Sequence, residues 1–238
     1  MARADGRAPD ALREVKMSTD FVKFPEGSCL IECGDTKVLC CASVEEKTPP
    51  HVREGHGWVT AEYSMLPRAN RERSRRDVDK LKISGRSAEI QRLIGRSLRA
   101  AVDMKALGER TVTIDCDVLQ GDGGTRTASV TGAYVALVLA CRKLMEQGLV
   151  RKDPIRHQVA AVSAGIVGGE LLLDLQYSED SRAEVDFNCV MDDGGHIIEV
   201  QGTGEGRSYT VEEQQKMLSL CGEGIRILME KQNEVLAK

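Results

Sequence analysis

The apolar positions in the first half of the chain are typical of β-strands, with one helical segment among them. Two apolar runs flank Gly34-Asp35 between residues 28 and 45, which predicts a β-hairpin. Residues 57–63 and 111–119 form further strand-like runs. Residues 85–104 carry apolar side chains at three- and four-residue steps, and this spacing predicts an amphipathic helix.

The most regular helical pattern lies near the middle of the chain, over residues 128–148, where the apolar side chains form one stripe. Two hairpins are expected after it, 158–167 with 170–177 and 183–191 with 196–202. A last helix is expected over residues 211–236. Residues 1–25 are polar and irregular, which favours either an ordered surface arm or a loose terminus.

Each half of the chain therefore runs from paired strands to a helix. We predict an α+β fold in which mixed sheets pack against helices, as a single domain over residues 1–238. A chain of 238 residues is long enough to bury a sizeable core.

Composition narrows the environment of the protein. Aromatic residues make up only 3% of the chain, so aliphatic and sulfur-containing side chains must fill the core. A formal net charge of −4 argues against a protein that coats nucleic acid over its whole surface, so contact with nucleic acid would need a local basic patch. The eight cysteines include no CxxC pair, which favours buried free thiols, a reducing compartment and a cytoplasmic protein. No apolar run reaches about 18 residues, so we expect no membrane span.

A glycine-rich turn, Gly121 to Arg126, separates the strand at 111–119 from the central helix. Its glycines allow positive φ and close approach to a ligand, and the backbone N–H groups at a helix start favour an anion. The guanidinium of Arg126 adds a planar fork that suits phosphate. A turn that needs glycine only for its shape is the alternative, and no Lys follows as in a P-loop.

Arginines gather in two further places. Five occur in nine residues, which predicts either a solvated loop or an arm that grips a polyphosphate backbone: Arg68, Arg71, Arg73, Arg75 and Arg76. Arg86 stands at a predicted helix start, where the helix dipole disfavours a cation. Arg86 is therefore a second possible phosphate ligand.

Acidic residues cluster in the second and third predicted strands of the second half and in the turn between them. Asp174, Asp180, Glu184 and Asp186 should gather if these strands pair as expected. Such carboxylates repel one another unless a cation such as Mg²⁺ or a proton joins them, and one could act as a general acid. The alternative is the solvent-facing side of a half-exposed hairpin.

A phosphate cradle, an arginine-rich arm and paired acids together favour phosphorolysis, in which inorganic phosphate is the attacking group. Two rivals remain open at this stage. A non-catalytic subunit of a ring assembly would need the same α+β fold but not the phosphate-binding and acidic residues. A small-molecule phosphotransferase would need no arginine-rich arm.

The sequence also resembles the ribonuclease PH family of phosphorolytic 3′-exoribonucleases, also called phosphate-dependent tRNA nucleotidyltransferases. The resemblance extends from Asp5-Gly-Arg7 to the last helix. Its landmarks are Gly34 to Leu39, Gly57 to Tyr63, Met65 to Arg68, Ser84 to Arg99, Gly121 to Ser129, Glu179 to Ser181, Val185 to Asn188 and Gln201 to Glu205.

The resemblance implies a role for each part. Phosphate would lie between Arg86 and the Gly124, Thr125, Arg126 turn; Asp180 and Asp186 would be the catalytic or Mg²⁺-binding acids. The arm from Arg68 to Arg76 would hold the body of a tRNA precursor. The fold would be the duplicated β-α unit of the ribosomal protein S five (domain two)-like class, assembled as a homohexamer that is a trimer of dimers.

Overall fold

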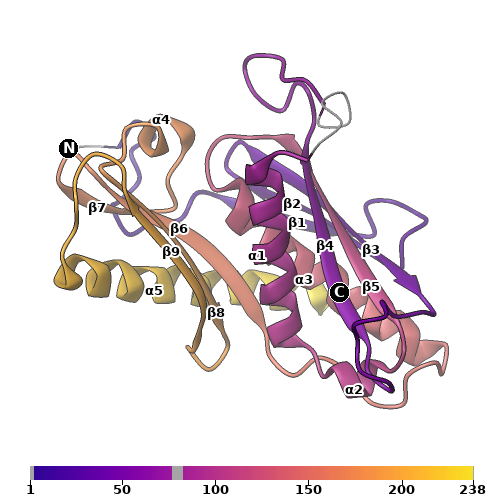
Figure 1. Cartoon of the computed structure of the whole chain (residues 1–238). Helices are drawn as coiled ribbons and strands as arrows, with labels where there is room; N and C mark the ends of the chain where they lie inside the picture. Colours follow the sequence, from indigo (N-terminus) through magenta and orange to yellow (C-terminus); the bar gives the residue numbers. More distant parts are fainter. Residues whose placement is uncertain (1–2, 77–82, 238) are drawn as a thin grey trace.

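The computed structural model describes residues 3–76 and 83–237, which form two β-sheets packed with long helices (Figure 1). The first sheet has the order β1-β2-β3-β5-β4. Its strands are β1 (Val15–Thr19), β2 (Gly27–Cys33), β3 (Thr36–Glu45), β4 (Trp58–Met65) and β5 (Thr111–Gln120). All neighbours in it are antiparallel except β4 and β5, which are parallel and are connected through α1 (Gly85–Ala101) and α2 (Met104–Leu107).

The second sheet has the order β7-β6-β8-β9 and is antiparallel throughout. Its strands are β6 (Val159–Val167), β7 (Glu170–Leu173), β8 (Val185–Asp192) and β9 (Ile197–Gly204). The one-turn helix α4 (Tyr177–Asp180) lies between β7 and β8 in the chain. The last helix, α5 (Val211–Leu236), packs on β6 and β8 and also contacts β1 of the first sheet.

The central helix α3 (Thr125–Glu146) contacts β2 and β3 on one side and β6 on the other. The predicted apolar stripe is buried, but the prediction of a single stripe is wrong, since Ser129, Thr131 and Gly132 are buried as well. A Cβ on Gly132 would lie 2.7 Å from Ile31, so glycine lets the helix approach β2 closely. By length and composition alone α3 could cross a membrane, yet 78% of its most apolar window is buried in this fold.

Several predicted elements are confirmed, including the first hairpin, the strands β4 and β5, and the last helix. The central helix begins earlier than expected, at Thr125, and α1 ends at Ala101. The predicted strand at 170–177 is wrong in its second half, because Asp174 has φ +52° and Tyr177 begins a helix. The sequence analysis also missed β1, which lies in a segment expected to be irregular.

The cysteines are core residues. All eight are free, and all but the half-buried Cys41 are buried, as the sequence predicted. Burial raises the pKa of the Cys29 and Cys141 thiols to about 12, so these groups stay protonated and behave as small apolar side chains.

Candidate active site

The glycine turn packs tightly against the segment that leads to α4. Gly123 and Gly124 have φ of 79° and 64°, and a Cβ on Gly123 would lie only 2.4 Å from the carbonyl oxygen of Leu175. Both the backbone conformation and the close approach therefore require glycine. Gly124 is the N-cap of α3 and supplies no side-chain cap, and no acid stands in the first helical turn. This helix start has the character of an anion site.

Gly124, Thr125 and Arg126, three of the predicted phosphate ligands, lie at this turn, and the side chains of Thr125 and Arg126 differ in their contacts. The Thr125 hydroxyl is buried and lies 2.8 Å from the Tyr63 hydroxyl, with which it shares a hydrogen bond. The Arg126 guanidinium donates to the Gln201 amide oxygen of β9 at 2.9 Å and lies 3.9 Å from the Glu89 carboxylate of α1. Arg126 therefore joins elements from both halves of the chain.

Arg86 is an exposed residue in the first turn of α1. Burial raises the pKa of Tyr63, and the hydrogen bond from Thr125 and the charges of Arg86 and Arg126 oppose this rise. Burial likewise raises the pKa of Asp180, against the charges of Arg86, Arg126 and Arg13. The charge of Arg86 thus acts on both Tyr63 and Asp180, which is consistent with its predicted place opposite Arg126.

The two predicted catalytic acids come together from different elements. Asp180 ends α4, and Asp186 lies on β8, where its carboxylate accepts a hydrogen bond from the Asn188 amide at 3.1 Å. Burial raises the pKa of Asp186, and the charge of Asp180 raises it further. The Asp180 side chain reaches solvent, but the protein around it raises its pKa as well. These acids can therefore hold a proton more readily than ordinary aspartates.

A third acid shares this site. Glu205, which follows β9, adds negative charge that raises the pKa of both Asp180 and Asp186. A hard divalent cation with oxygen ligands would relieve the repulsion among these carboxylates. Asp180 and Asp186 could hold such a cation, with Glu205 close enough to contribute charge.

Asp174 and Glu184 do not join this cluster, so the expected gathering of four acids is wrong. Asp174 is buried and paired with Arg13, whose Nη2 lies 2.7 Å from its Oδ1. Glu184 pairs with Arg207 at 2.8 Å. The reason is the early end of β7, after which the chain turns at Asp174 and no longer continues the strand alternation.

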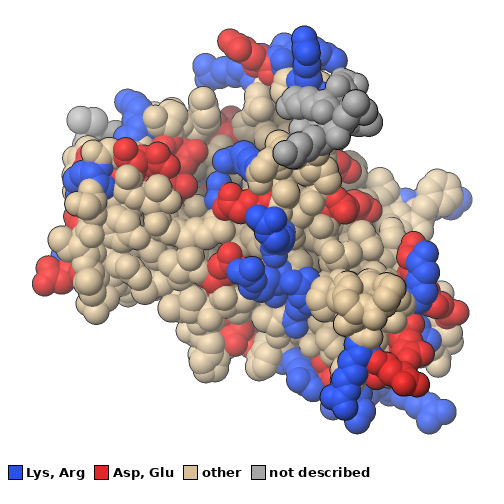
Figure 2. Space-filling view, in the orientation of Figure 1, with Lys and Arg blue, Asp and Glu red and all other residues tan. Residues whose placement is uncertain are grey.

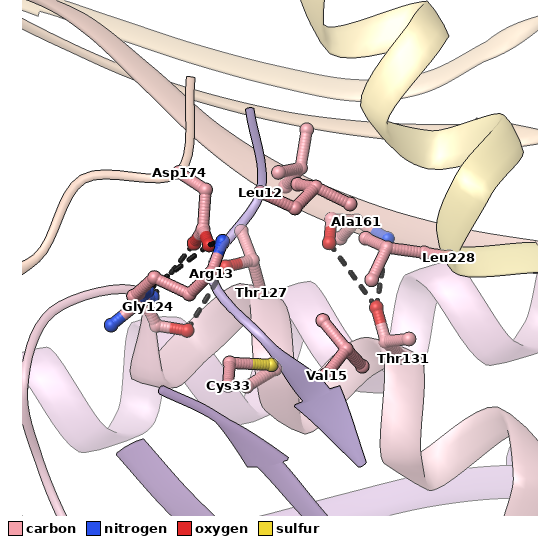
Figure 3. Close-up of a pocket in the computed structure, with 12 residues that line it drawn as sticks. Leu12, Arg13, Val15, Cys33, Gly124, Thr127, Thr131, Ala161, Asp174 and Leu228 are labelled. Atoms are coloured by element: carbon pink, nitrogen blue, oxygen red, sulfur yellow. Dashed lines mark hydrogen bonds and ion pairs between the residues drawn. The ribbon is translucent and has the colours of Figure 1, made fainter. Parts of the chain in front are cut away.

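The N-terminal arm packs against the glycine turn, and its Arg13 lies between Asp174 and Gly124 (Figure 3). Arg13 donates to both carboxylate oxygens of Asp174 and to the Asp122 carbonyl oxygen of the glycine turn. Arg3 binds the Glu179 carboxylate at 2.7 and 2.8 Å, one residue before Asp180. The sequence analysis missed these arginines as site residues. Their buried pairing partners lie far away in the chain, and no local pattern marks them.

The predicted RNA-binding arginines lie on a loop beside the turn. Arg68, Arg71, Arg73, Arg75 and Arg76 are all exposed. The base of the loop is anchored by buried Ala69, whose carbonyl oxygen accepts the Gly121 N–H at 2.9 Å. Figure 2 shows further basic side chains over α1, on the same face of the molecule. The arginine-rich loop is thus tied directly to the glycine turn.

Sequence comparison with known proteins decides the family. Both domains of the 3′ exoribonuclease family match, domain 1 over residues 11–143 and domain 2 over residues 157–223. Ribonuclease PH of Bacillus mycoides is 55% identical over 236 residues, which are 98% of this chain and 96% of that protein. Ribonuclease PH of Syntrophomonas wolfei is 54% identical over 237 residues, or 99% of each chain. The chain belongs to the 3′ exoribonuclease family.

Solved structures agree with this family in fold. Rice (Oryza sativa) Rrp46 superposes with a TM-score of 0.80 at 18% identity, covering 98% of this chain and 100% of that one. The Archaeoglobus fulgidus exosome with RNA bound to its active site gives a TM-score of 0.83 at 24% identity, covering 96% and 92%. At these identities the likeness concerns the fold, and it confirms the α+β class predicted for this 3′ exoribonuclease family member.

Proposed function

We propose that this protein is a phosphate-dependent 3′-to-5′ exoribonuclease that trims tRNA precursors and releases nucleoside 5′-diphosphates in a reversible reaction. One observation carries the proposal: the uncapped start of α3 carries no acid in its first turn, and the charges of Arg86 and Arg126 act on the Asp180 carboxylate. The ribonuclease PH relatives, which align over nearly the whole chain, support the same reading.

The site would act by positioning and by neutralising charge. Inorganic phosphate binds the N–H groups of the Gly124 to Arg126 turn and the guanidinium groups of Arg86 and Arg126, which offset its repulsion by RNA. A phosphate oxygen attacks the phosphorus of the last phosphodiester, and the bond from that phosphorus to the 3′-oxygen of the penultimate nucleotide breaks. The leaving oxygen takes a proton, which the raised pKa of the acid pair makes available.

The alternative to proton donation is that Asp180 and Asp186 are ionised and would hold Mg²⁺, which when bound would supply positive charge to the phosphate oxygens. Burial is the main cause of the raised pKa of both carboxylates, and a bound cation would offset the cost of burying them as well as the repulsion that Asp180 exerts on Asp186. The exposed arginines from Arg68 to Arg76 would hold the phosphate backbone of the tRNA body.

We propose a homohexamer, arranged as a trimer of dimers, that works in the cytoplasm. The eight free cysteines support a reducing compartment. Native mass spectrometry should find a species of six times the 26.0 kDa chain mass. A monomer at working concentration would contradict the hexamer without affecting the proposed reaction.

The test of the reaction uses a tRNA with extra 3′ nucleotides, with and without inorganic phosphate, in the presence of Mg²⁺. Release of nucleoside diphosphate only with phosphate supports phosphorolysis. Nucleoside monophosphate without phosphate would mean hydrolysis, and bound but unshortened tRNA would mean that the protein is a non-catalytic subunit.

A further inference from the structure

Tyr177 is an exposed aromatic residue at the edge of the site, and the reaction described above does not use it. It is the first residue of α4, the one-turn helix that ends at Asp180, and 56% of its surface is exposed. An exposed tyrosine ring offers a flat face on which a ligand ring can stack. Its place in the chain, three residues before a catalytic acid, puts that ligand at the reaction site.

The backbone of Tyr177 is fastened to the glycine turn. Its N–H donates to the Asp122 carbonyl oxygen at 3.2 Å, and a Cβ on Gly123 would lie 2.9 Å from its nitrogen. The ring is therefore carried by a rigid segment next to the anion site. A rigid platform loses little conformational entropy when a ligand covers it.

Tyr177 also faces the arginine-rich loop across a groove. The groove has a volume of about 620 Å³, and Arg71 and Arg73 contribute to its walls together with Tyr177. Glu72 and Asp122 line it too, so its charges largely balance. A groove of this kind attracts phosphate weakly. The flat faces of a tyrosine ring and of guanidinium groups instead suit the flat face of a nucleobase.

We propose that Tyr177 is a stacking platform for a base of the RNA strand, between the reacting 3′ end and the part of the RNA held by the arginine-rich loop. The inference rests on the proposed exoribonuclease function and adds a substrate contact to it. Stacking accepts every base, because every base has a π-face. The contact therefore holds the strand in line for attack without selecting the nucleotide to be removed.

The experiment measures phosphorolysis of a single-stranded RNA oligonucleotide by the wild type, Tyr177→Ala and Tyr177→Phe. Tyr177→Ala should raise KM for the RNA on the order of tenfold with little change in KM for phosphate. Tyr177→Phe should restore the wild-type value, since it keeps the ring and loses only the hydroxyl. The matched control is Phe24→Ala, which removes an 87%-exposed ring from the β1–β2 loop and should change neither constant.

Oligonucleotides with one abasic site, moved along the last few positions, separate stacking from a general defect. At the stacked position, one abasic site should raise the wild-type KM for RNA by the same factor by which Tyr177→Ala raises it on intact RNA. The same abasic site should not raise the KM of Tyr177→Ala any further. An unchanged KM in Tyr177→Ala overturns the inference, as does an equal penalty at every abasic position. Anisotropy of the same labelled oligonucleotides without phosphate tests the contact even if the wild type proves inactive, so failure of the reaction and failure of the contact remain distinguishable.

Discussion

At the scale of single residues, the environment that suits Asp186 to catalysis also lowers the stability of the folded protein at neutral pH. Folding places it among protein atoms and close to Asp180, and both effects raise its pKa above the ordinary 3.8. A carboxylate whose pKa is raised on folding stabilises the protein when protonated, and this contribution is lost as the pH rises through the folded-state pKa. Asp186 therefore destabilises the folded protein at neutral pH unless a cation binds.

Asp186→Asn should remove that destabilisation while stopping the chemistry. In the absence of divalent cations, the variant should gain free energy of unfolding over the wild type as the pH is raised from roughly 4 to 7, measured by urea denaturation. Its phosphorolysis rate should fall on the order of 10²-fold or more. A stability difference that does not depend on pH would refute the assignment of a raised pKa.

Arg13 represents the opposite case, a buried charge whose partner is already in place. Arg13→Ala removes the closest cation from the buried Asp174 carboxylate, which keeps the backbone N–H of residue 13 and the Arg7 guanidinium at 3.8 Å, and it should lower the free energy of unfolding by about 3 kcal/mol. The control is Arg207→Ala, which breaks exposed pairs with Glu184 and Glu213 and should cost much less stability than Arg13→Ala. Both free energies of unfolding are measured by urea denaturation. If the two variants lose the same amount, the buried ion pair of Arg13 contributes no more to stability than an exposed one.

At the scale of elements, the glycine turn connects a strand, a helix start and the segment before α4. Gly123→Ala should lower the free energy of unfolding and raise KM for phosphate, because the new Cβ would displace Leu175 or the turn. Gly148→Ala is the matched control, since Gly148 also has positive φ but has no atom within 4 Å of the position of a Cβ. The control should cost about 1–2 kcal/mol and leave the phosphate constant unchanged. If both variants behave alike, close packing at Gly123 is irrelevant to the site.

At the scale of the whole molecule, the site is built from both halves of the chain. Arg86 and Arg126 come from helices α1 and α3, whereas Asp180 and Asp186 come from α4 and β8. The arginine-rich loop lies beside this site, and the carbonyl oxygen of Ala69 anchors the loop to the glycine turn. Phosphate use and RNA binding should therefore respond to different substitutions.

Arg126→Ala should raise KM for phosphate roughly tenfold or more, as expected for loss of a charge-assisted hydrogen bond, with little effect on RNA affinity. The triple variant of Arg73, Arg75 and Arg76 to Ala should do the reverse. It should weaken tRNA binding and reduce the slope of log affinity against log salt by about 2.

A charge-matched control removes three exposed basic residues outside the arm, Arg151, Lys152 and Arg226. It should leave the salt slope close to that of the wild type. Affinity of tRNA measured over a salt series, together with KM for phosphate, checks all three variants. A salt slope that falls equally in the control would assign RNA binding to overall charge rather than to the arm.

The sequence by itself determined the local features and the family. Alternating and helical spacing predicted the hairpin of β2 and β3, the last helix and the α+β class, because side-chain periodicity follows directly from backbone geometry. Glycine and arginine at a strand-to-helix turn predicted an anion site, since the chemistry of a helix start is local. The long match with ribonuclease PH landmarks indicated the family that the comparisons confirm.

Only the tertiary structure decided which distant residues meet. The acids were misjudged at Asp174 and Glu184, because one residue with positive φ ends β7 and redirects the chain, and residue spacing does not encode such a turn. The buried arginines Arg3 and Arg13 looked like surface residues until their partners, more than 150 positions away, were in place. Burial and ion pairing depend on packing between elements, and packing is a property of the whole fold.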